Sequence, residues 1–304
     1  MWRTKMNDFV KNELEKNRLY FEEQLRSFCS CKPDAIPERL WQSMTYSLLA
    51  GGKRLRPILC LQAAESVGGI REKVLSMAIA LEMVHTASLI HDDLPAMDND
   101  SLRRGKPTNH IIFGDALAIL AGDALLAWAF QYPLNKLSEE GFLSSSIIHA
   151  LSVFAEAIGP FGICGGQVLD TDPESFEPSP LFVKKIALQK TAILIKSAVV
   201  TGAILGGASS KQISAFENYG NHLGLAFQIV DDILDVTSTA EELGKTPGKD
   251  AKQEKTTFVT QFGIEESRKM ALQESEEAAA VISSIGKNTK FFQELALSLA
   301  ERSR

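Results

Sequence analysis

The chain has 304 residues, of which 45% are hydrophobic and 23% are charged, and its formal net charge is −6 at pH 7. This length corresponds to one large domain or two ordinary ones, and it is sufficient for a sizeable apolar core. The acidic balance argues against general nucleic-acid binding, so an anionic ligand would have to be met by a local concentration of Lys and Arg. The charged N-terminal stretch is not typical of a signal peptide, and four cysteines without paired zinc spacing are typical of free thiols in a reducing compartment. We therefore expect a cytoplasmic protein.

The elements expected along the chain are helices, because alternating apolar runs are nearly absent and Ala, Leu, Glu and Lys recur at helical spacing. The expected helices span residues 7–28, 38–49, 57–67, 71–94, 112–131, 144–158, 181–205 and 211–236. Neither an interdomain linker nor a repeat of fixed period is visible, so the pattern predicts an all-α fold with a single domain over residues 1–304. The most apolar stretch, 192–208, contains Lys196, so no stable membrane insertion is expected.

The first basic segment is LLAGGKRLRPIL, which begins at residue 48. Gly51 and Gly52 should end the preceding helix or allow a tight turn. Lys53, Arg54 and Arg56 place three cations within four residues of this turn, and such a group can hold a phosphate. The GxxxxGK[ST] spacing of a nucleotide P-loop is missing. Taken alone, the segment is equally compatible with a simple charge cluster at a helix end.

An acidic cluster followed by a basic pair occupies the region after the helix that includes residues 81–90. Its charged residues are Asp92, Asp93, Asp98, Asp100, Arg103 and Arg104. Dense carboxylates beside an apolar run repel one another unless a cation offsets their charge, and Mg²⁺ prefers oxygen ligands while also binding phosphate. On a straight helix Asp92 and Asp98 would point about 120° apart. Both reach one ion only if the helix kinks or ends near Pro95. A solvated charged loop is the alternative interpretation.

A second acidic cluster, FQIVDDILDV, lies in the helix expected at residues 211–236. Asp231 and Asp235 are four residues apart and share one helix face, whereas the aspartate at 232 is offset by one position. Three carboxylates in five positions destabilise a helix, so structure alone does not explain them. Gln228 lies on the same side of the helix as Asp231 and Asp232. Lys190, next to Thr191 in an apolar helix, is a further functional candidate, because an unpaired ammonium group is costly there.

Carboxylates on two separate helices of a bundle can hold metal ions in its core, and such ions would bind a diphosphate between the two motifs. The cations near them are more than one diphosphate needs: Lys53, Arg56, Arg103 and Arg104. This excess indicates a second anionic ligand.

Several motifs resemble, in order and separation, the signatures of trans-isoprenyl diphosphate synthases: DDLPAMD at 92–98, LRRG at 102–105, GGKRLRP at 51–57 and FQIVDDILD at 227–235. KT at 190–191, GGQ at 165–167 and GK at 244–245 and 248–249 also match. The resemblance, over roughly residues 40–260, implies an all-helical isoprenoid-synthase bundle around a central cavity, usually a homodimer. It also implies head-to-tail condensation of isopentenyl diphosphate with an allylic diphosphate, dependent on Mg²⁺, with Mn²⁺ as a possible substitute.

The resemblance assigns roles to single residues. The metal ions that hold the allylic diphosphate would be bound by aspartates of both motifs, namely Asp92, Asp93, Asp98, Asp231 and Asp235. The allylic diphosphate would also contact Arg103, Lys190 and Lys245. Isopentenyl diphosphate would be bound by Lys53, Arg56, His85 and Arg104, with Lys255 near the mouth of the cavity. Ser101 stands where relatives often have another Asp, which weakens the acidic cluster at its edge. For His91 a packing role is expected, because Mg²⁺ prefers oxygen.

The chemistry implied by the resemblance is ionisation of the allylic C–O bond, with charge stabilised where it develops. Thr191 and Gln228, beside Lys190, would direct dipoles toward the carbocation in a dry pocket. The isopentenyl double bond then attacks, and the departed diphosphate is the base for the final proton.

Product length in this family depends on bulk just before the first acidic motif. Relatives that make farnesyl diphosphate commonly have an aromatic residue there, whereas this chain has Ala87 and Ser88. We therefore expect a product longer than C15, namely geranylgeranyl diphosphate. A lower floor could come from Phe113, Leu125, Phe154 or Phe161. The alternatives are a farnesyl diphosphate synthase, a class I terpene cyclase, which would not need the second cation group, and a silent partner subunit, which would usually lack one acidic motif.

Overall fold

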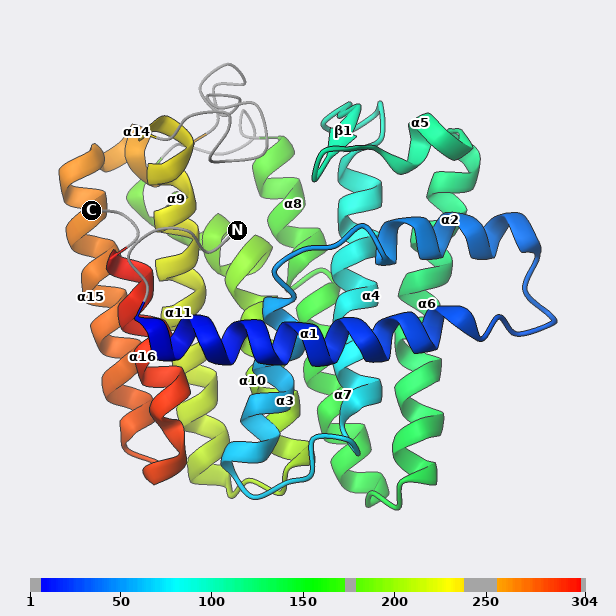
Figure 1. Cartoon of the computed structure of the whole chain (residues 1–304). Helices are drawn as coiled ribbons and strands as arrows, with labels where there is room; N and C mark the ends of the chain where they lie inside the picture. Colours follow the sequence, from blue (N-terminus) through cyan, green and yellow to red (C-terminus); the bar gives the residue numbers. More distant parts are fainter. Residues whose placement is uncertain (1–6, 173–178, 238–255, 302–304) are drawn as a thin grey trace.

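The computed structural model describes residues 7–172, 179–237 and 256–301. Its helices are α1 (Asp8–Ser30), α2 (Glu38–Leu48), α3 (Leu55–Ser66), α4 (Leu75–Asp92), α5 (Asn109–Phe113), α6 (Asp115–Glu139), α7 (Ser144–Ile158), α8 (Ile163–Thr171), α9 (Pro180–Ile186), α10 (Ile193–Leu205), α11 (Ser210–Thr237), α14 (Phe258–Phe262), α15 (Ile264–Ser283) and α16 (Lys290–Glu301) (Figure 1). A 3₁₀ turn, Lys287–Thr289, precedes α16, and the strands β1 (Leu102–Arg103) and β2 (Lys106–Pro107) pair as a short antiparallel hairpin. The expectation of an all-α fold is confirmed.

Helices α4 and α10 form the centre of the bundle because they are apolar around most of their circumference, a pattern typical of a buried helix. In α10 every residue except Lys196 is buried. Helix α4 packs against α3 and α6, and α10 packs against α3, α7 and α11. The C-terminal end of α4 therefore delivers the first acidic motif from the core of the bundle.

The apolar segment expected as one regular helix over residues 181–205 has three parts. Helix α9 leads into a π-helix, Ala187–Ala192, which continues as α10. A π-helix closes its hydrogen bonds over five residues instead of four, and such turns are found mostly at functional sites. Hydrophobic spacing does not reveal this change of pitch, so the sequence-based prediction of a single regular helix is wrong here.

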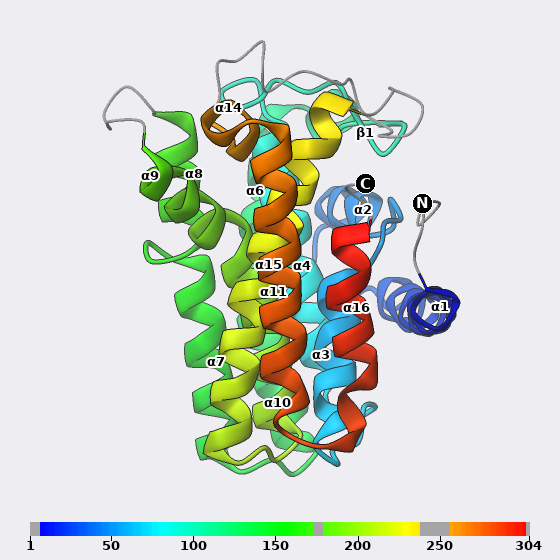
Figure 2. The same ribbon diagram turned by 90° about the vertical axis from the view of Figure 1, so that its left-hand side faces the viewer.

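Helix α1 lies across the other helices (Figure 1), and Figure 2 looks along it. An aromatic cluster attaches it to α6: the Phe28 ring centroid lies 5.0 Å from that of Trp128 and 4.9 Å from that of Tyr132. Trp41 of α2 joins the same cluster, 5.9 Å from Trp128. Offset and edge contacts of this kind add to the burial of the rings, so α1 and α2 are held firmly on the bundle.

Three helical stretches are long and apolar enough, by length and composition alone, to cross a membrane: Asp115–Glu139, Ser144–Thr171 and Pro180–Leu205. The argument that Lys196 rules out such a span is therefore wrong. The most apolar window is 72% buried in Pro180–Leu205 but only 33% and 28% buried in the other two stretches. Pro180–Leu205 is apolar because it lies in the core, whereas α6 and α7–α8 leave apolar side chains on the surface.

Candidate active site

The first acidic motif lies where α4 ends. The helix stops at Asp92, before Pro95, and the chain then turns back so that the Asp98 N–H donates to the Asp92 carbonyl oxygen over 2.9 Å. This ending, which the sequence required for a shared ion, brings the Asp98 carboxylate within electrostatic reach of Asp92. Burial, reinforced by Asp98, raises the pKa of Asp92 to about 6. A carboxyl group with a raised pKa beside a second carboxylate is typical of a functional site.

The second aspartate of the motif has a different neighbour. Asp93 is 3% exposed, and its carboxylate accepts hydrogen bonds from the Arg103 guanidinium, with Nε 3.0 Å from Oδ1. Arg103 belongs to the hairpin, whose turn has positive φ at both Arg104 (54°) and Gly105 (75°), as a type I′ turn requires. The Asp93–Arg103 ion pair fixes this hairpin against the end of α4. A metal role for Asp93 and a diphosphate role for Arg103 stay predictions.

A group of cations surrounds the loop between α2 and α3. The Arg104 guanidinium donates to the Gly51 carbonyl oxygen and lies so close to Gly52 that a Cβ there would be 2.7 Å away. Burial lowers the pKa of Arg56 to about 10, and its buried Nε donates to no acceptor among the residues that the structure describes. Burial together with Arg56 and Arg104 lowers the pKa of His85 well below its usual range, so its imidazole is neutral at pH 7. This group is suited to an anionic ligand.

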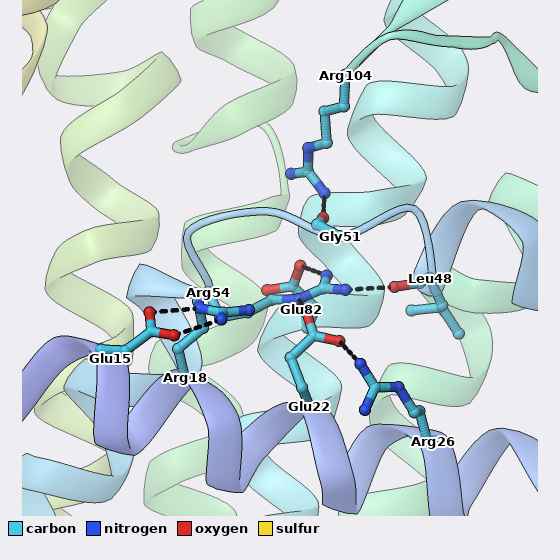
Figure 3. A network of polar contacts seen from close by, with 9 residues as sticks. All are labelled: Glu15, Arg18, Glu22, Arg26, Leu48, Gly51, Arg54, Glu82 and Arg104. Atoms are coloured by element: carbon cyan, nitrogen blue, oxygen red, sulfur yellow. Dashed lines mark hydrogen bonds and ion pairs between the residues drawn. The ribbon is translucent and has the colours of Figure 1, made fainter. Parts of the chain in front are cut away.

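Arg54 does not belong to this anion-binding group. Its guanidinium is buried and donates to Glu22 of α1 over 2.7 Å, to Glu82 of α4, and to the Leu48 carbonyl oxygen over 2.7 Å (Figure 3). The sequence presented Arg54 as one of three phosphate-binding cations, whereas the structure places it in an internal ion network. Sequence reasoning missed both glutamates, although a glutamate within the apolar run of α4 was a visible signal.

The π-helix, α8 and α11 form a second wall of the site, opposite the end of α4 and the hairpin. Lys190 Nζ donates to Asp170 Oδ2 of α8 over 2.5 Å, and its charge also acts on Asp92. The Thr191 hydroxyl donates to Gln228 Oε1 of α11 over 2.6 Å. The three residues predicted to be catalytic are therefore brought together, with Lys190 directed toward the first acidic motif.

Asp232, the middle aspartate of the second acidic motif, is buried and serves the fold. One carboxylate oxygen accepts from Gln228 Nε2 and the other from the Phe258 N–H at the start of α14, both over 2.8 Å. Asp231, by contrast, is half-buried and its charge acts on Arg56 across the site. Asp232, which is offset by one position from Asp231, therefore points to Gln228 and the start of α14, whereas the charge of Asp231 acts on Arg56.

Close packing against glycines holds the π-helix in place. A Cβ at Gly166 of α8 would lie 2.4 Å from the Lys190 nitrogen, and one at Gly224 of α11 would lie 2.3 Å from the Ala192 Cα. Neither position has room for a side chain. Because Asp170 follows Gly166 by four residues on the same helix face, the close approach of α8 also brings Asp170 to Lys190.

Two cavities border these groups. One of about 490 Å³ is lined by the second wall and the start of α14, including Asp170, Lys190, Thr191, Gln228 and Phe258. The other, of about 400 Å³, lies between α2, α4 and the hairpin, and its lining includes Tyr46, Asp93, Arg103 and Arg104. The first contains the predicted catalytic residues.

The carboxylates predicted to bind metal lie on both motifs: Asp92, Asp93, Asp98, Asp231 and Asp235. Within residues 7–172, 179–237 and 256–301, no three His, Cys, Asp or Glu side chains converge closely enough to hold an ion by themselves. An ion that takes only one or two carboxylates from the protein and completes its shell with water and phosphate oxygens is typical of Mg²⁺. Carboxylate oxygens are the ligands that Mg²⁺ prefers, so the chemistry of these side chains suits such an ion.

Of the remaining cations of the predicted site, the structure describes Lys53. Lys53 Nζ lies 5.9 Å from the ring centroid of Phe227 on α11, which brings the start of α3 to the helix of the second acidic motif. Lys245 and Lys255 lie outside the described residues.

His91 packs against α6, as its expected role implies. Its Nε2 lies 3.2 Å from the Ile119 carbonyl oxygen and 3.7 Å from Asp123. A Cβ at Gly122 would lie 2.1 Å from the same ring nitrogen, so α6 provides a glycine where the imidazole rests.

The four side chains considered as a lower floor lie in different surroundings. Leu125 and Phe154 are fully buried, whereas Phe161 is 71% exposed. Phe113 packs against Tyr46 of α2, with ring centroids 5.6 Å apart. Which of the four side chains forms a floor stays a prediction, because none of them belongs to the lining of the two cavities described above.

The chain is similar to known proteins over most of its length. Residues 37–291 match the family model described as polyprenyl synthetase. The chain is 49% identical over 247 residues to a geranylgeranyl diphosphate synthase of Cyanophora paradoxa, covering 81% of this chain and 82% of the relative. It is 47% identical over 268 residues to a chloroplastic geranylgeranyl pyrophosphate synthase of Capsicum annuum, covering 86% and 72%.

Among solved structures, a geranyltransferase from Legionella pneumophila superposes with a TM-score of 0.83 at 32% identity, covering 97% of this chain and 98% of that one. The fold is thus the helical isoprenoid-synthase bundle that the motifs implied. On the extent of the family match and the identity to its relatives, the chain belongs to the polyprenyl synthetase family.

Proposed function

We propose that the chain is a Mg²⁺-dependent short-chain prenyltransferase. It condenses isopentenyl diphosphate with dimethylallyl, geranyl or farnesyl diphosphate, and its main product is geranylgeranyl diphosphate. The observation that carries the proposal is the Asp92–Asp98 pair, which has the charge of Lys190 within electrostatic reach. A second group has its own cations, Arg56 and Arg104, around His85. Two separate sites for negatively charged groups suit a reaction that joins two diphosphates.

The allylic diphosphate is assigned to the acidic side of the site. Mg²⁺ bound by aspartates of the two motifs would supply positive charge to the diphosphate as it departs. Lys190, poised between Asp170 and Asp92, adds a cation at the same place. The Thr191 hydroxyl and the Gln228 amide, oriented by their mutual hydrogen bond, present fixed dipoles to the carbon that becomes positive.

Isopentenyl diphosphate is assigned to the cation group around the loop between α2 and α3. Arg56 has a buried donor ready for an acceptor, and Arg104 lies over Gly52. The neutral imidazole of His85 can donate one N–H without adding charge to an arginine-rich site. Lys53, at the edge of the loop, adds a further ammonium group.

The preference for a C20 product rests on the residues one helical turn before the first acidic motif. Ser88 is half-buried and lies on the same face of α4 as Asp92, four residues later. Its short side chain donates to the His85 carbonyl oxygen over 2.9 Å, so it adds little bulk beneath the metal site. The relatives from Cyanophora paradoxa and Capsicum annuum, whose names specify geranylgeranyl products, support the same product here.

One assay tests the function. The purified chain is incubated with isopentenyl diphosphate, Mg²⁺ and dimethylallyl, geranyl or farnesyl diphosphate in turn, and the products are sized by chromatography. We expect elongation to C20 with release of diphosphate. A cyclic hydrocarbon formed from the allylic substrate alone would identify a cyclase instead, and absence of turnover would indicate a silent subunit. Elongation that stops at C15 would contradict the product length only.

We also propose that the chain forms a homodimer through α6, α7 and α8. These helices and the turn between α7 and α8 expose large apolar side chains, namely Ile119 (44%), Leu120 (57%), Ile148 (67%), Phe161 (71%) and Val168 (57%). Helices α7 and α8 lie at the edge of the bundle (Figure 2). Large apolar side chains exposed on neighbouring helices are typical of an interface, and a second copy of the chain would cover them with the same residues in a two-fold arrangement.

The dimer is tested by light scattering after size-exclusion chromatography. The wild type should elute as a dimer and Ile148→Asp as a monomer, because a buried carboxylate without a partner is costly. Leu297→Asp, at an exposed apolar residue of α16 on the other side of the bundle (Figure 2), is the matched control and should stay dimeric. A monomeric wild type that sediments with lipid vesicles would instead assign this face to a membrane.

A single domain over residues 1–304 and a cytoplasmic location complete the proposal. The Capsicum annuum relative is named chloroplastic, so the family does not restrict the compartment. Fractionation of the source cells with an antibody against this chain tests the location, and limited proteolysis tests the domain.

A further inference from the structure

The ion network around Arg54 joins four segments of the chain at one point. Arg54 is 3% exposed, and its guanidinium donates to Glu22 of α1, to Glu82 of α4 and to the Leu48 carbonyl oxygen at the end of α2, while its own backbone precedes α3 (Figure 3). A planar guanidinium with five N–H donors can serve three acceptors in fixed directions, which a lysine cannot. The fork therefore sets the relative positions of α1, α2 and α4 around the loop.

The loop held by this fork is the one that carries the second cation group. Between Leu48 and Arg54 the backbone has positive φ at Gly51 (83°), Gly52 (139°) and Arg54 itself (52°), so it depends on tertiary contacts for its shape. Arg54, at the C-terminal end of the loop, donates to the Leu48 carbonyl oxygen at its N-terminal end. Within the loop, the Gly51 carbonyl oxygen accepts a hydrogen bond from Arg104 (Figure 3). The network thus determines where the side chains that flank Arg54 can reach.

Glu82 also affects the cation group by its charge. It lies three residues before His85 on α4, so both occupy one side of the helix. Although burial lowers the pKa of Arg56 and of Arg104, the charge of Glu82 raises both. Glu82 consequently favours the charged form of two arginines that it does not itself hydrogen-bond.

We propose that Glu22 and Glu82 are positioning residues for the isopentenyl diphosphate site. Acting through Arg54, they hold the Gly51–Gly52 loop in the shape that lets Arg56 and Arg104 meet one diphosphate. Neither glutamate touches the substrate. The inference rests on the proposed function, because it assigns isopentenyl diphosphate to this cation group.

The test compares Glu22→Gln and Glu82→Gln with the wild type in steady-state kinetics. We expect the KM for isopentenyl diphosphate to rise about tenfold in each, since small displacements of positioning groups have effects of this size, while the KM for the allylic diphosphate is unchanged. Glu15→Gln is the matched control, because Glu15 pairs with Arg18 on the same helix at the surface and makes no contact with Arg54. Its kinetics should equal those of the wild type.

A second variant separates positioning from simple stability. Glu22→Met/Arg54→Met/Glu82→Met removes all three charges together, and replacing a buried ion network by apolar residues of similar volume is often neutral or stabilising. We expect its Tm to return toward that of the wild type while the KM for isopentenyl diphosphate stays raised. Recovery of KM together with Tm, or an equal rise in both KM values, would overturn the positioning role.

Failure of the inference is distinguishable from failure of the proposed function. A wild type that elongates allylic diphosphates, together with glutamate variants of unchanged KM, contradicts the inference alone. A wild type without prenyl transfer contradicts the proposed function, and calorimetric titration with isopentenyl diphosphate then decides the inference: equal affinity of the wild type and Glu82→Gln overturns it, and weaker binding by Glu82→Gln supports it.

Discussion

Helix α4 carries a buried acidic side chain, Glu82, in its middle and a half-buried one, Asp92, at its end. The two differ in which cations lie beside them. Glu82 binds Arg54, which also binds Glu22, and despite burial the two glutamates raise the pKa of Arg54. Asp92 lies beside Asp98, and burial raises its pKa to about 6. The charge of Glu82 is neutralised (compensated) by its ion pair with Arg54. The charge of Asp92 is only partly offset, because Asp98 lies near it as well as the cations Lys190 and Arg103.

Two arginines of the GGKRLRP motif also differ in whether the protein supplies partners for their charge. Arg54 has all its neighbours in place and a raised pKa, whereas Arg56, two positions later, has a pKa lowered to about 10 and a buried Nε without an acceptor among the described residues. A buried ion pair whose hydrogen bonds are all made holds its side chains in one position. A buried charge that lacks such partners can still gain them from a bound ligand, and that gain favours binding. The presence or absence of protein partners thus distinguishes Arg54, which positions the loop, from Arg56, which is free to bind an anion.

The largest effect is expected at the uncompensated end of α4. Asp92→Asn should lower kcat on the order of 10³-fold at saturating Mg²⁺, because it removes a charge that holds the metal at the departing diphosphate. Steady-state assays measure this. Asp34→Asn, at an exposed aspartate in the loop before α2, is the control and should leave kcat unchanged.

The same variant has a pH signature in metal-free buffer. The folded pKa of Asp92, about 6, lies above the usual value of 3.8, so its contribution to stability is fully present below pH 3.8 and is lost as the pH rises to about 6. The wild type should therefore lose stability relative to Asp92→Asn between pH 4 and pH 6, with no further change at higher pH. A difference that is independent of pH would contradict the raised pKa.

The compensated region predicts a contrast in stability. Arg54→Met leaves two buried glutamates without their partner, and it should lower the free energy of unfolding by about 3–5 kcal/mol in urea titrations. Arg56→Met removes a buried charge that lacks such partners, so it should cost little stability while raising the KM for isopentenyl diphosphate. Equal destabilisation by the two substitutions would remove the distinction between them.

A product change without loss of activity is expected between the two regions. Ser88→Phe places a ring one helical turn before Asp92, where the proposed function puts the growing product, so the product should shift from C20 toward C15. Chromatography of labelled products measures the shift. Leu19→Phe, at an exposed residue of α1, is the control and should keep the wild-type product distribution.

The smallest effect is a difference in thiol reactivity. Burial raises the pKa of Cys29 to about 12, and the charge of Arg54 acts on the same thiol. Cys31 is exposed two positions later and should react with iodoacetamide at pH 8, whereas Cys29 should stay unmodified. Mass spectrometry distinguishes the two sites. Labelling of Cys29 that appears only in Arg54→Met would report opening of the compensated region, and labelling at equal rates in the wild type would show that the region is not closed.

Much of the site was predictable because it depends on local spacing and charge. The six-residue separation of Asp92 and Asp98 required a helix end near Pro95, and α4 ends there. Helical periodicity gave the all-α class and most helix positions to within a few residues. The aspartate motifs and the order of the basic segments gave the family, which residues 37–291 confirm.

The sequence by itself determined the fold class, the acidic motifs and the two groups of cations, because these follow from residue types at fixed short separations. Only the tertiary structure decided which charges are compensated. Arg54 meets Glu22 from a helix that lies across the bundle, and Lys190 is placed by a π-helix that Gly166 and Gly224 allow to pack closely. The physical reason is that charge compensation and helix pitch depend on which distant surfaces come together, and Arg54 differs from Arg56 only in the neighbours that the fold supplies.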